Sequence, residues 1–580
     1  MGLSRFFKSP RSRGNCSLRN VSFLKSKLFP LLSLLLFAIV PVSSQDQGAS
    51  SEAKAIRGTV INSVTQEPIP RALVTSTNER FATLTDSSGH FEFTIPKAQN
   101  DASTPVNGVF ISAGLSHRNE VWLNARKPGF FNNQERYLPS VVDKDNIISL
   151  IPEAIIKGHI SLSTGDPAAG VSVQIYSHQV ANGFFRWTQG AVTRTDSAGE
   201  FRFAELVGGN YKIATHEFMD ADPQAAVSGD ERPIFPPSYF PGGSDFASGA
   251  DIDLQAGQTA EANLTLTLQR YYPIRIPVAG NDANVPLLVT LKGPHGPGFD
   301  LGYNASERRI EGSLPNGTYI VEVICGGPSQ SAASVTITVQ GAPTDGPVLA
   351  LAHFATIPVV VKEEFNNKVW NGSVFMGVGG RTFAINGPRR YLNISVETVD
   401  DFSAFRGGAI RPPTGPNDVG MELDNLAPGK YWINVNTSRG YVASATSGST
   451  DLLHEPLKVV SGANSPIEVT LRDDAASLDG NIAKSSGQQA VIAPGTTVYV
   501  VPLPDSSGQF QQTGISPDGK FELQNLPPGS YRVLAFATSQ KALPYRDVES
   551  MKAWEGKGQV VRLTAGQKTS VQIPLVEPGN

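Results

Sequence analysis

The sequence predicts an all-β protein, made of about five small antiparallel β-sandwich domains in tandem. The first observation is size, because a chain of 580 residues is too long for a single hydrophobic core. The second is composition: 56 glycines and 42 prolines, with only 17% charged residues, favour short strands and turns over helices. The third is a motif that recurs roughly every hundred residues, which fits one sandwich per repeat and is too long for a solenoid unit.

The first 44 residues have the layout of a signal peptide, and residues 45–54 are expected to be a flexible leader. Seven lysines and arginines precede an apolar run from Leu28 to Val42, and no acidic residue occurs before Asp46. The apolar run is 15 residues long and contains two prolines, so an uncleaved membrane anchor is the weaker alternative. We therefore expect an exported chain, in the periplasm, at the cell surface or outside the cell, with no transmembrane segment in its mature form.

Residues 55–152 and 155–268 are expected to form the first and second modules. Each opens on a strand that contains a glycine, and each later has an Asp-x-x-Gly turn followed by two phenylalanines at alternate positions. Alternation puts both phenylalanines on one face of a strand, toward the core. The motif positions are Asp86, Gly89, Phe91 and Phe93 in the first module, and Asp196, Gly199, Phe201, Phe203 and Tyr211 in the second.

Residues 271–352, 354–472 and 476–576 are expected to form the third, fourth and fifth modules. The third and fourth keep the second half of the motif, a leucine and a tight turn that lead to Tyr319 and Tyr431. The fifth has the clearest copy, and its glycines are expected to take positive φ in the turns. Its motif positions are Asp518, Gly519, Phe521, Leu523, Gly529 and Tyr531. A short helix is expected within residues 545–555.

This succession of a glycine-containing strand, a Pro turn, an Asp-x-x-Gly-x-Phe-x-Phe segment and a Leu-x-x-Gly-x-Tyr segment resembles the carboxypeptidase regulatory-like domain family. The resemblance implies transthyretin-like, seven-stranded β-sandwich repeats of the carbohydrate-binding-like fold, as in multi-repeat exported bacterial proteins. It covers the first, second and fifth modules well and the third and fourth less closely. The family's domain carries no peptidase activity of its own. Related adhesin modules form Lys–Asn isopeptide bonds; Lys157 and Asn263 are candidates here, with an exposed lysine as the favoured reading.

Charge and cysteine content narrow the possible partners. Without the signal peptide the chain has 41 basic and 52 acidic residues, a net charge of about −11. Such a chain is expected to bind neither nucleic acid nor anionic membrane surfaces. Cys16 lies in the signal peptide and Cys325 is then alone, so no intrachain disulfide is expected, and Cys325 is expected to be a small buried residue.

The sequence offers no convincing catalytic or metal site. His117-Arg118-Asn119-Glu120 has the His-x-x-Glu spacing of a zinc peptidase, but no catalytic domain surrounds it, and His216 and His353 belong to other modules. The turns at Asp86 and Asp196 lack the dense acidic ligands that calcium needs, so turn capping is the expected role. We therefore expect no catalytic residues, no metal and no cofactor.

Aromatic residues in two loops are the candidate ligand-binding residues, because sugars stack on exposed aromatic faces. They are Phe184, Phe185 and Trp187 between two strands, and Tyr239 and Phe240 in a Pro-rich insertion over residues 233–243. The alternative is that Phe185 and Trp187 point into a sandwich core. The predicted function is a non-catalytic binding, adhesion or scaffolding role at the cell envelope, with a carbohydrate or an envelope protein as partner. The alternatives are a carbohydrate-binding protein and an accessory subunit of a peptidase or envelope transporter.

Overall fold

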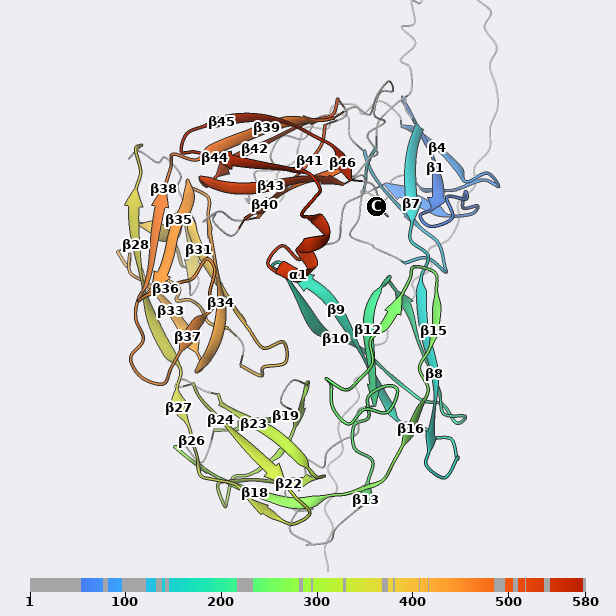
Figure 1. Cartoon of the computed structure of the whole chain (residues 1–580), viewed down its shortest axis with the longest axis vertical. Helices are drawn as coiled ribbons and strands as arrows, with labels where there is room; N and C mark the ends of the chain where they lie inside the picture. The colour runs from blue at the N-terminus through green and yellow to red at the C-terminus, as the bar shows by residue number, and fades with distance from the viewer. Residues whose placement is uncertain are drawn as a thin grey trace, which may run out of the picture. The chain divides into compact units, whose positions relative to one another are not determined.

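The computed structural model confirms a nearly all-β chain (Figure 1). It describes residues 54–76, 82–95, 121–131, 138–140, 145–215, 233–280, 285–293, 296–326, 330–367, 374–378, 381–405, 407–415, 417–483, 496–503, 510–516, 518–536 and 543–576. The expected signal peptide and most of the leader lie outside these residues. Within them, no helix has the length and apolarity needed to cross a membrane.

The strands of the first three expected modules follow one another in chain order. The first module has β1 (Lys54–Asn62), β2 (Leu73–Ser76), β3 (Ala82–Leu84), β4 (His90–Ile95), β5 (Val121–Arg126), β6 (Leu138–Ser140) and β7 (Asp145–Leu150). The second has β8 (Ala154–Leu162), β9 (Ser172–Ala181), β10 (Phe184–Arg194), β11 (Glu200–Leu206), β12 (Gly209–Thr215), β13 (Pro233–Ile234), β14 (Ile252–Leu254), β15 (Thr259–Glu261), β16 (Leu264–Leu266) and β17 (Gln269–Arg270). The third has β18 (Tyr272–Ala279), β19 (Leu287–Lys292), β20 (Gly298–Asp300), β21 (Gly302–Asn304), β22 (Arg309–Leu314), β23 (Gly317–Cys325), β24 (Ser331–Val339), β25 (Thr344–Asp345), β26 (Leu349–Ala350) and β27 (Ala352–His353).

The remaining elements belong to the last two expected modules, and they include the expected short helix. The fourth module has β28 (Ala355–Glu364), β29 (Phe375–Val378), β30 (Arg381–Ala384), β31 (Leu392–Thr398), β32 (Ala409–Ile410), β33 (Met421–Leu426), β34 (Gly429–Thr437), β35 (Tyr441–Ser447), β36 (Thr450–Asp451), β37 (Leu457–Val459) and β38 (Ile467–Arg472). The fifth has β39 (Ala476–Ile482), β40 (Thr497–Pro502), β41 (Gln511–Gly514), β42 (Lys520–Leu526), β43 (Gly529–Phe536), α1 (Val548–Met551), β44 (Gln559–Leu563), β45 (Lys568–Ile573) and β46 (Leu575–Val576).

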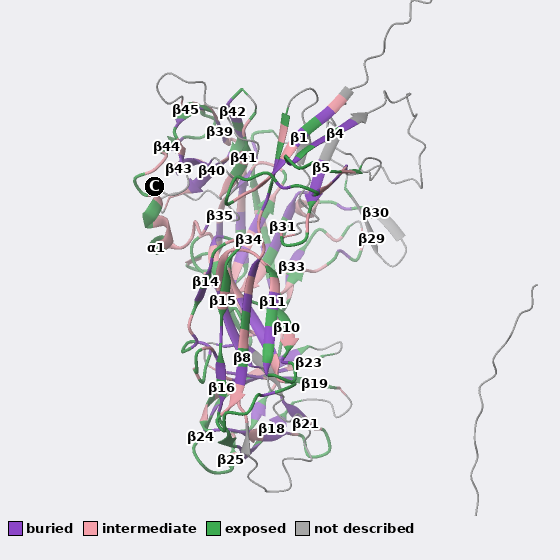
Figure 2. Cartoon of the chain, turned by 90° about the vertical axis from the view of Figure 1, so that its right-hand side faces the viewer, coloured by how far each residue is buried: buried purple, intermediate pink, exposed green. Residues whose placement is uncertain are grey.

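Five main hydrophobic cores lie one within each expected module. The motif phenylalanines of β4, β11 and β42, together with Leu523, are all less than 10% exposed and belong to these cores. Figure 2 shows the resulting alternation of buried and exposed residues along the strands. The module boundaries themselves stay a prediction, because residues Lys54–Asn580 form one compact unit.

Each module departs from a wholly antiparallel sandwich because a closing strand pairs in parallel with the first strand; in the fifth module β46 also pairs in parallel with β43. The parallel pairs are β1 with β7, β8 with β15 and β16, β18 with β25 and β26, β28 with β38, and β39 with β45. In the fourth module the two sheets join into one nine-stranded path through β32. Two parallel strands must be joined by a long crossover connection. In these modules the strands between the first strand and the closing strand form that connection.

In the first, second and fifth modules, the glycine of the first strand lies directly opposite a motif phenylalanine. Gly158 pairs with Phe201, and Gly480 pairs with Phe521. A Cβ at Gly480 would lie 2.4 Å from the carbonyl oxygen of Val571 on the parallel strand and 2.6 Å from the Phe521 ring. The glycine is therefore required for the closing strand and the ring to approach together.

The Asp-x-x-Gly turns are capped as expected in the first two modules and differently in the fifth. One carboxylate oxygen of Asp86 accepts the backbone N–H of Ser88 and His90, each at 2.8 Å. In the fifth module the equivalent place is taken by Ser516, whose hydroxyl accepts the N–H of Lys520 at 3.1 Å. Asp518 lies two residues further along and accepts the Ser516 hydroxyl at 2.6 Å.

The motif tyrosines fix what we call the corner turns, the six residues that lead from a motif leucine in one sheet to a tyrosine in the other. The corner turns are residues 206–211, 314–319, 426–431 and 526–531. In each of them the tyrosine hydroxyl donates to the carbonyl oxygen four residues earlier, at 2.6–3.0 Å. This bond satisfies a carbonyl that no sheet partner reaches at the corner.

The corner-turn glycines have a different role from the one expected. Gly317, Gly429 and Gly529 do not take positive φ. A Cβ at Gly317 would instead lie 2.9 Å from the Tyr319 hydroxyl oxygen, so the glycine leaves room for the tyrosine ring. Positive φ occurs just before the turn, at Asn525 and at Asn425, where each strand has a bulge.

We predict that Gly480→Ala destabilises the fifth module by about 3 kcal/mol, because the new Cβ meets a backbone carbonyl that cannot move independently. Hydrogen exchange of β39 and β42 peptides across a denaturant series measures this. Gly514→Ala is the matched control, since no atom lies within 4 Å of its Cβ position. Equal effects of the two substitutions would contradict the close-approach explanation.

We predict that Tyr531→Phe costs the fifth module about 2 kcal/mol, since it leaves the Pro527 carbonyl unpaired in a buried corner turn. The same exchange experiment on β43 peptides is the measurement. Tyr319→Phe should cost the third module less, because Tyr319 is only half-buried. An unchanged fifth module would show that the hydroxyl bond does not stabilise the corner.

Candidate functional site: an aromatic and charged junction

The predicted aromatic loop is the tip of the β9–β10 hairpin. Asn182 and Gly183 form its two-residue turn and both take positive φ, 49° and 82°, as a type I′ turn requires. The side chains of β10 then alternate between two faces. Phe184 and Arg186 lie on one face, and Phe185 and Trp187 lie on the other.

The first face of the hairpin packs against the fourth and fifth modules. The Phe184 ring stacks on Trp432 with centroids 4.7 Å apart. The guanidinium of Arg546 lies over both rings, 4.6 Å from Phe184 and 4.3 Å from Trp432. The backbone N–H of Arg546 also donates to the carbonyl of Gly183 at 2.9 Å. Phe184 is therefore held within the molecule by aromatic and cation–π contacts.

Arg186 is a buried cation, 6% exposed, that joins the hairpin to the fourth module. Its Nη1 donates to Asp401 Oδ1 at 2.9 Å and to the Val399 carbonyl at 3.0 Å. Glu397 lies 3.8 Å from its Nε. The second oxygen of Asp401 accepts the backbone N–H of Trp187 at 2.9 Å. A buried charge is costly without partners, so these acceptors fix the hairpin in place.

The second face carries an aromatic ladder made of Phe185, His178 and Trp187. The His178 ring stacks between the other two, with centroids 4.9 Å from Phe185 and 4.4 Å from Trp187. Phe185 is 38% exposed. Burial lowers the pKa of His178, against the opposing effect of Asp251 and Asp401. The ladder lies outside the main core of the second module, but Trp187 packs edge-on against Phe246 at 5.3 Å in a second buried cluster, which leaves Phe185 as the exposed aromatic ring of the ladder.

The Pro-rich insertion is anchored beside the ladder. Tyr239 is 4% exposed and packs edge-on against Phe246 at 5.9 Å. Phe240 is half-buried against the main core of the second module. Burial raises the pKa of Tyr239 well above its usual value. Lys212 donates to the carbonyls of Phe246 and Gly249 at 2.9 and 2.6 Å, and so holds the insertion from beneath.

A second buried cation, Lys292, joins the third and fourth modules. Its side chain is 2% exposed, and its ammonium lies 2.7 Å from Glu322 and 2.5 Å from Asp400. Burial acts to lower the pKa of Lys292, but the two carboxylates outweigh it and raise the pKa above its ordinary value. Glu322 also accepts the backbone N–H of Ala404 at 2.8 Å.

These contacts surround an open hollow of about 900 Å³, which we call the junction pocket. The ladder residues Phe185 and Trp187, Phe402, and the corner turn at 428–431 line it. Among the charged residues that line it, Arg186 pairs with Asp401, and Glu322 and Asp400 pair with Lys292. These pairs stabilise the junction, while Lys430 and Phe185 are exposed. Among the described residues, no group of three His, Cys, Asp or Glu side chains could hold a metal ion.

The structure groups the predicted ligand-binding residues around two neighbouring features, the hairpin tip and the insertion. It brings Trp432, an aromatic candidate in the sequence, to the hairpin tip, and it adds residues that sequence reasoning missed: His178, Asp401 and Arg546. No local pattern marks Asp401 or Arg546, because their partner lies hundreds of residues away. His178 could have been found, because a strand partner one hairpin away from Trp187 is expected to lie beside it.

The other candidates from the sequence are the lone cysteine, the isopeptide residues and the zinc-like motif. Cys325 is buried at the end of β23, as expected. The ammonium of Lys157 is exposed and pairs with Glu261 at 3.2 Å, while Asn263 accepts the N–H of His159, an arrangement that favours the exposed-lysine reading. His117 and Glu120 of the zinc-like motif lie outside the described residues, as does His216.

No protein-family model and no curated protein matches the chain. Among solved structures it is similar to the Bacillus anthracis TIE protein, at 10% identity and TM-score 0.14, over 91% of this chain and 69% of that one. It is also similar to a streptococcal ancillary pilin, at 10% identity and TM-score 0.17, over 52% and 99%. A minor pilin of Streptococcus agalactiae matches at 13% identity and TM-score 0.18, over 37% and 96%. Because these TM-scores are low, we infer nothing about function from these similarities.

We predict that Arg186 and Asp401 are energetically coupled. Asp401→Ala leaves the buried Arg186 guanidinium without its closest carboxylate, and this should cost the junction about 3 kcal/mol. The double variant Arg186→Ala/Asp401→Ala should cost clearly less than the sum of the single changes. Protection of β9, β10 and β31 peptides from hydrogen exchange reports the junction. Strict additivity would mean that the pair does not hold the modules together.

We predict that acidification loosens the hairpin through His178. Its pKa is lower in the folded chain than the usual 6.5, so the folded state resists protonation. Stability is therefore complete well above pH 6.5 and falls as the pH drops below that value, where the unfolded chain takes up the proton more readily. Protection of β9 and β10 at pH 7.5 and 5.5 measures the effect. His178→Gln should remove most of the difference; an unchanged difference would assign it to the neighbouring acids.

Proposed function

We propose that this chain is an exported, non-catalytic binding and scaffolding protein of the cell envelope. In it the junction sets the relative placement of the second to fifth modules, so that surfaces on different modules act together. The observation that carries the proposal is the pairing of buried Arg186 with Asp401. A buried arginine that pairs with a carboxylate 215 residues further along the chain fits modules in a fixed arrangement better than modules that move independently.

We further propose that the first, second and fifth modules are of the carboxypeptidase regulatory-like type. The opposed glycine and phenylalanine in β8 and β11, and again in β39 and β42, support this. The basic and apolar layout of residues 1–44 supports export. An accessory role beside a peptidase or an envelope transporter remains the alternative within the same class.

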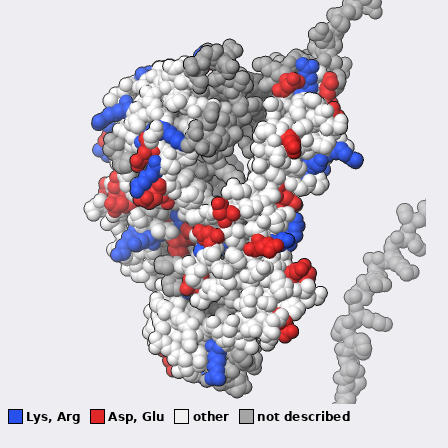
Figure 3. Space-filling model, turned by 45° about the vertical axis from the view of Figure 1, so that its right-hand side comes forward, with Lys and Arg blue, Asp and Glu red and all other residues white. Residues whose placement is uncertain are grey.

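The surface charge fits a protein or neutral ligand better than a polyanion. On the face shown in Figure 3, acidic and basic side chains are interspersed over a mostly uncharged surface. A nucleic-acid site would need a continuous basic stripe. The acidic net charge of the mature chain agrees with this.

A second candidate function is carbohydrate binding at the aromatic ladder. Phe185 is 38% exposed and continues a stack with His178 and Trp187. Such a stack offers a flat face to the apolar side of a sugar ring. Phe184, on the opposite face, is occupied by Trp432 and Arg546, which makes it the weaker of the hairpin candidates.

We predict that the purified mature chain co-sediments with isolated envelopes of its source organism and hydrolyses no peptide substrate. Because binding surfaces on several modules act together, Arg186→Ala should lower the apparent affinity by about tenfold while each module stays folded. Lys157→Ala, which removes an exposed ion pair, is the control and should bind normally. Absence of sedimentation, or peptidase activity in the purified chain, would contradict the proposed function.

A further inference from the structure

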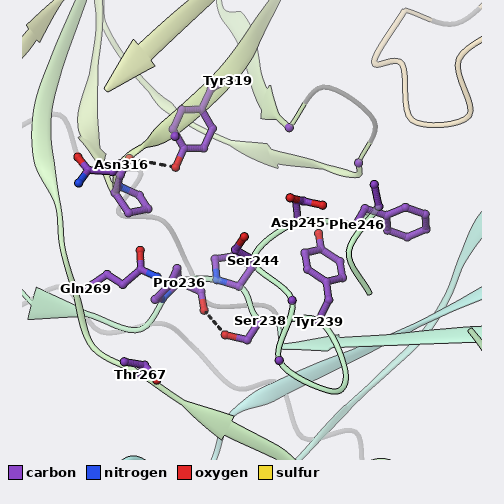
Figure 4. A pocket seen from close by; sticks show the side chains of 18 of the residues that line it. Pro236, Ser238, Tyr239, Ser244, Asp245, Phe246, Thr267, Gln269, Asn316 and Tyr319 are labelled. Carbon is purple, nitrogen blue, oxygen red and sulfur yellow. Dashed lines mark hydrogen bonds between the residues drawn. The ribbon is translucent and has the colours of Figure 1, made fainter. Parts of the chain in front are cut away.

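We propose that a second pocket, between the Pro-rich insertion and the third module, binds a neutral, hydroxyl-rich carbohydrate chain. The pocket has a volume of about 490 Å³, within the range of ~300–1,000 Å³ that ligand pockets usually have. We call it the insertion pocket (Figure 4). The inference rests on the binding role proposed above but uses a different surface from the aromatic ladder.

One wall of the insertion pocket is the insertion itself, residues 236–247. Backbone bonds tie it to the sandwich: Phe240 N–H donates to the Ile213 carbonyl at 2.9 Å, and Ala250 N–H donates to the Phe240 carbonyl at 2.7 Å. The buried ammonium of Lys212 holds the far end of the loop through the Phe246 and Gly249 carbonyls. The wall is thus held in place before any ligand arrives, which lowers the entropic cost of binding.

The opposite wall is the corner turn of the third module, whose third residue is unlike that of the other corner turns. Asn316 occupies a position that is glycine or proline in the other three. Its Oδ1 accepts the N–H of Gly341 at 2.6 Å, which orients the amide. Figure 4 shows Asn316 and Tyr319 across the open space from Ser244 and Asp245. The oriented Nδ2 is therefore a donor for a ligand oxygen.

The third side is a row of polar side chains that follows β16. Thr265, Thr267 and Gln269 line the pocket, and their spacing of two residues puts them on one face of an extended chain. Thr267 and Gln269 are exposed. Hydroxyl and amide groups in such a row can both donate and accept, as the hydroxyl groups along a sugar chain do.

The charge of the lining selects the ligand class. Among the described residues that line the pocket, Asp245 is the one charged side chain, and one of its oxygens accepts the N–H of Ser248 at 2.8 Å. Because the described lining residues include no cation, they disfavour phosphates and uronates, whose charge they could not balance. Asp245, Asn316 and Gln269 are planar groups that can each bridge neighbouring hydroxyls, and Tyr319 adds an aromatic surface. Neutral sugars fit this combination.

The experiment titrates the full mature chain with uncharged oligosaccharides of the maltose, cellobiose, xylose and mannose series, and with oligogalacturonate as the anionic arm. Calorimetry and saturation-transfer NMR are the readouts. At least one neutral series should bind, and oligogalacturonate should not. Asn316→Asp, which keeps the acceptor for Gly341, and Thr267→Val, which keeps the shape, should each weaken binding by about five- to tenfold.

Matched controls separate this inference from the proposed function. Asn393→Asp and Thr259→Val make the same changes at exposed positions outside the pocket, and both should bind like the unaltered chain. Binding that is lost in Trp187→Ala but kept in the pocket variants would overturn the inference in favour of the ladder. Absence of any neutral-sugar binding would overturn it as well. Co-sedimentation with envelopes tests the proposed function independently of that result.

Discussion

The hydrogen bond from a tyrosine hydroxyl to a carbonyl four residues earlier is the constraint on which each of the last four sandwiches depends. A sandwich must pass its chain from one sheet to the other, and at that point backbone carbonyls leave the ladder. A buried carbonyl without a partner costs roughly 1–3 kcal/mol. The tyrosine hydroxyl supplies the donor for this carbonyl, and the tyrosine ring fills the corner. The same residue lies at the start of the next strand, so it has three structural roles.

The corner turns also shape the two places where chemistry gathers. The third module's corner turn forms a wall of the insertion pocket, and the fourth module's lines the junction pocket. Because the turn is rigid, a change at one exposed position alters the surface without disturbing the fold. Asn316 in the third module and Lys430 in the fourth are such changes. The corner-turn motif can therefore stabilise the fold and also present a variable side chain to a ligand.

The β9–β10 hairpin divides its aromatic residues between two tasks by strand alternation. Phe184 and Arg186 face the fourth and fifth modules, where Trp432, Arg546 and Asp401 receive them. Phe185 and Trp187 face away and stack with His178. An aromatic-rich turn that looks like one binding surface in the sequence is therefore half interior contact and half open platform. A one-residue shift in register would exchange the two roles.

The sequence by itself determined the fold class, the repeat and the core positions, because these follow from local rules. Alternation places Phe521 and Leu523 inward, and a polar residue three positions before the turn glycine caps the turn, whatever the neighbouring modules do. It also marked the hairpin and the insertion as unusual. Only the tertiary structure decided the parallel closing strands, the close approach at Gly480 and the partners of Arg186, Lys292 and Asn316. Those interactions join segments up to 215 residues apart. They form only when whole modules take up their positions in the folded chain, and no local sequence pattern encodes those positions.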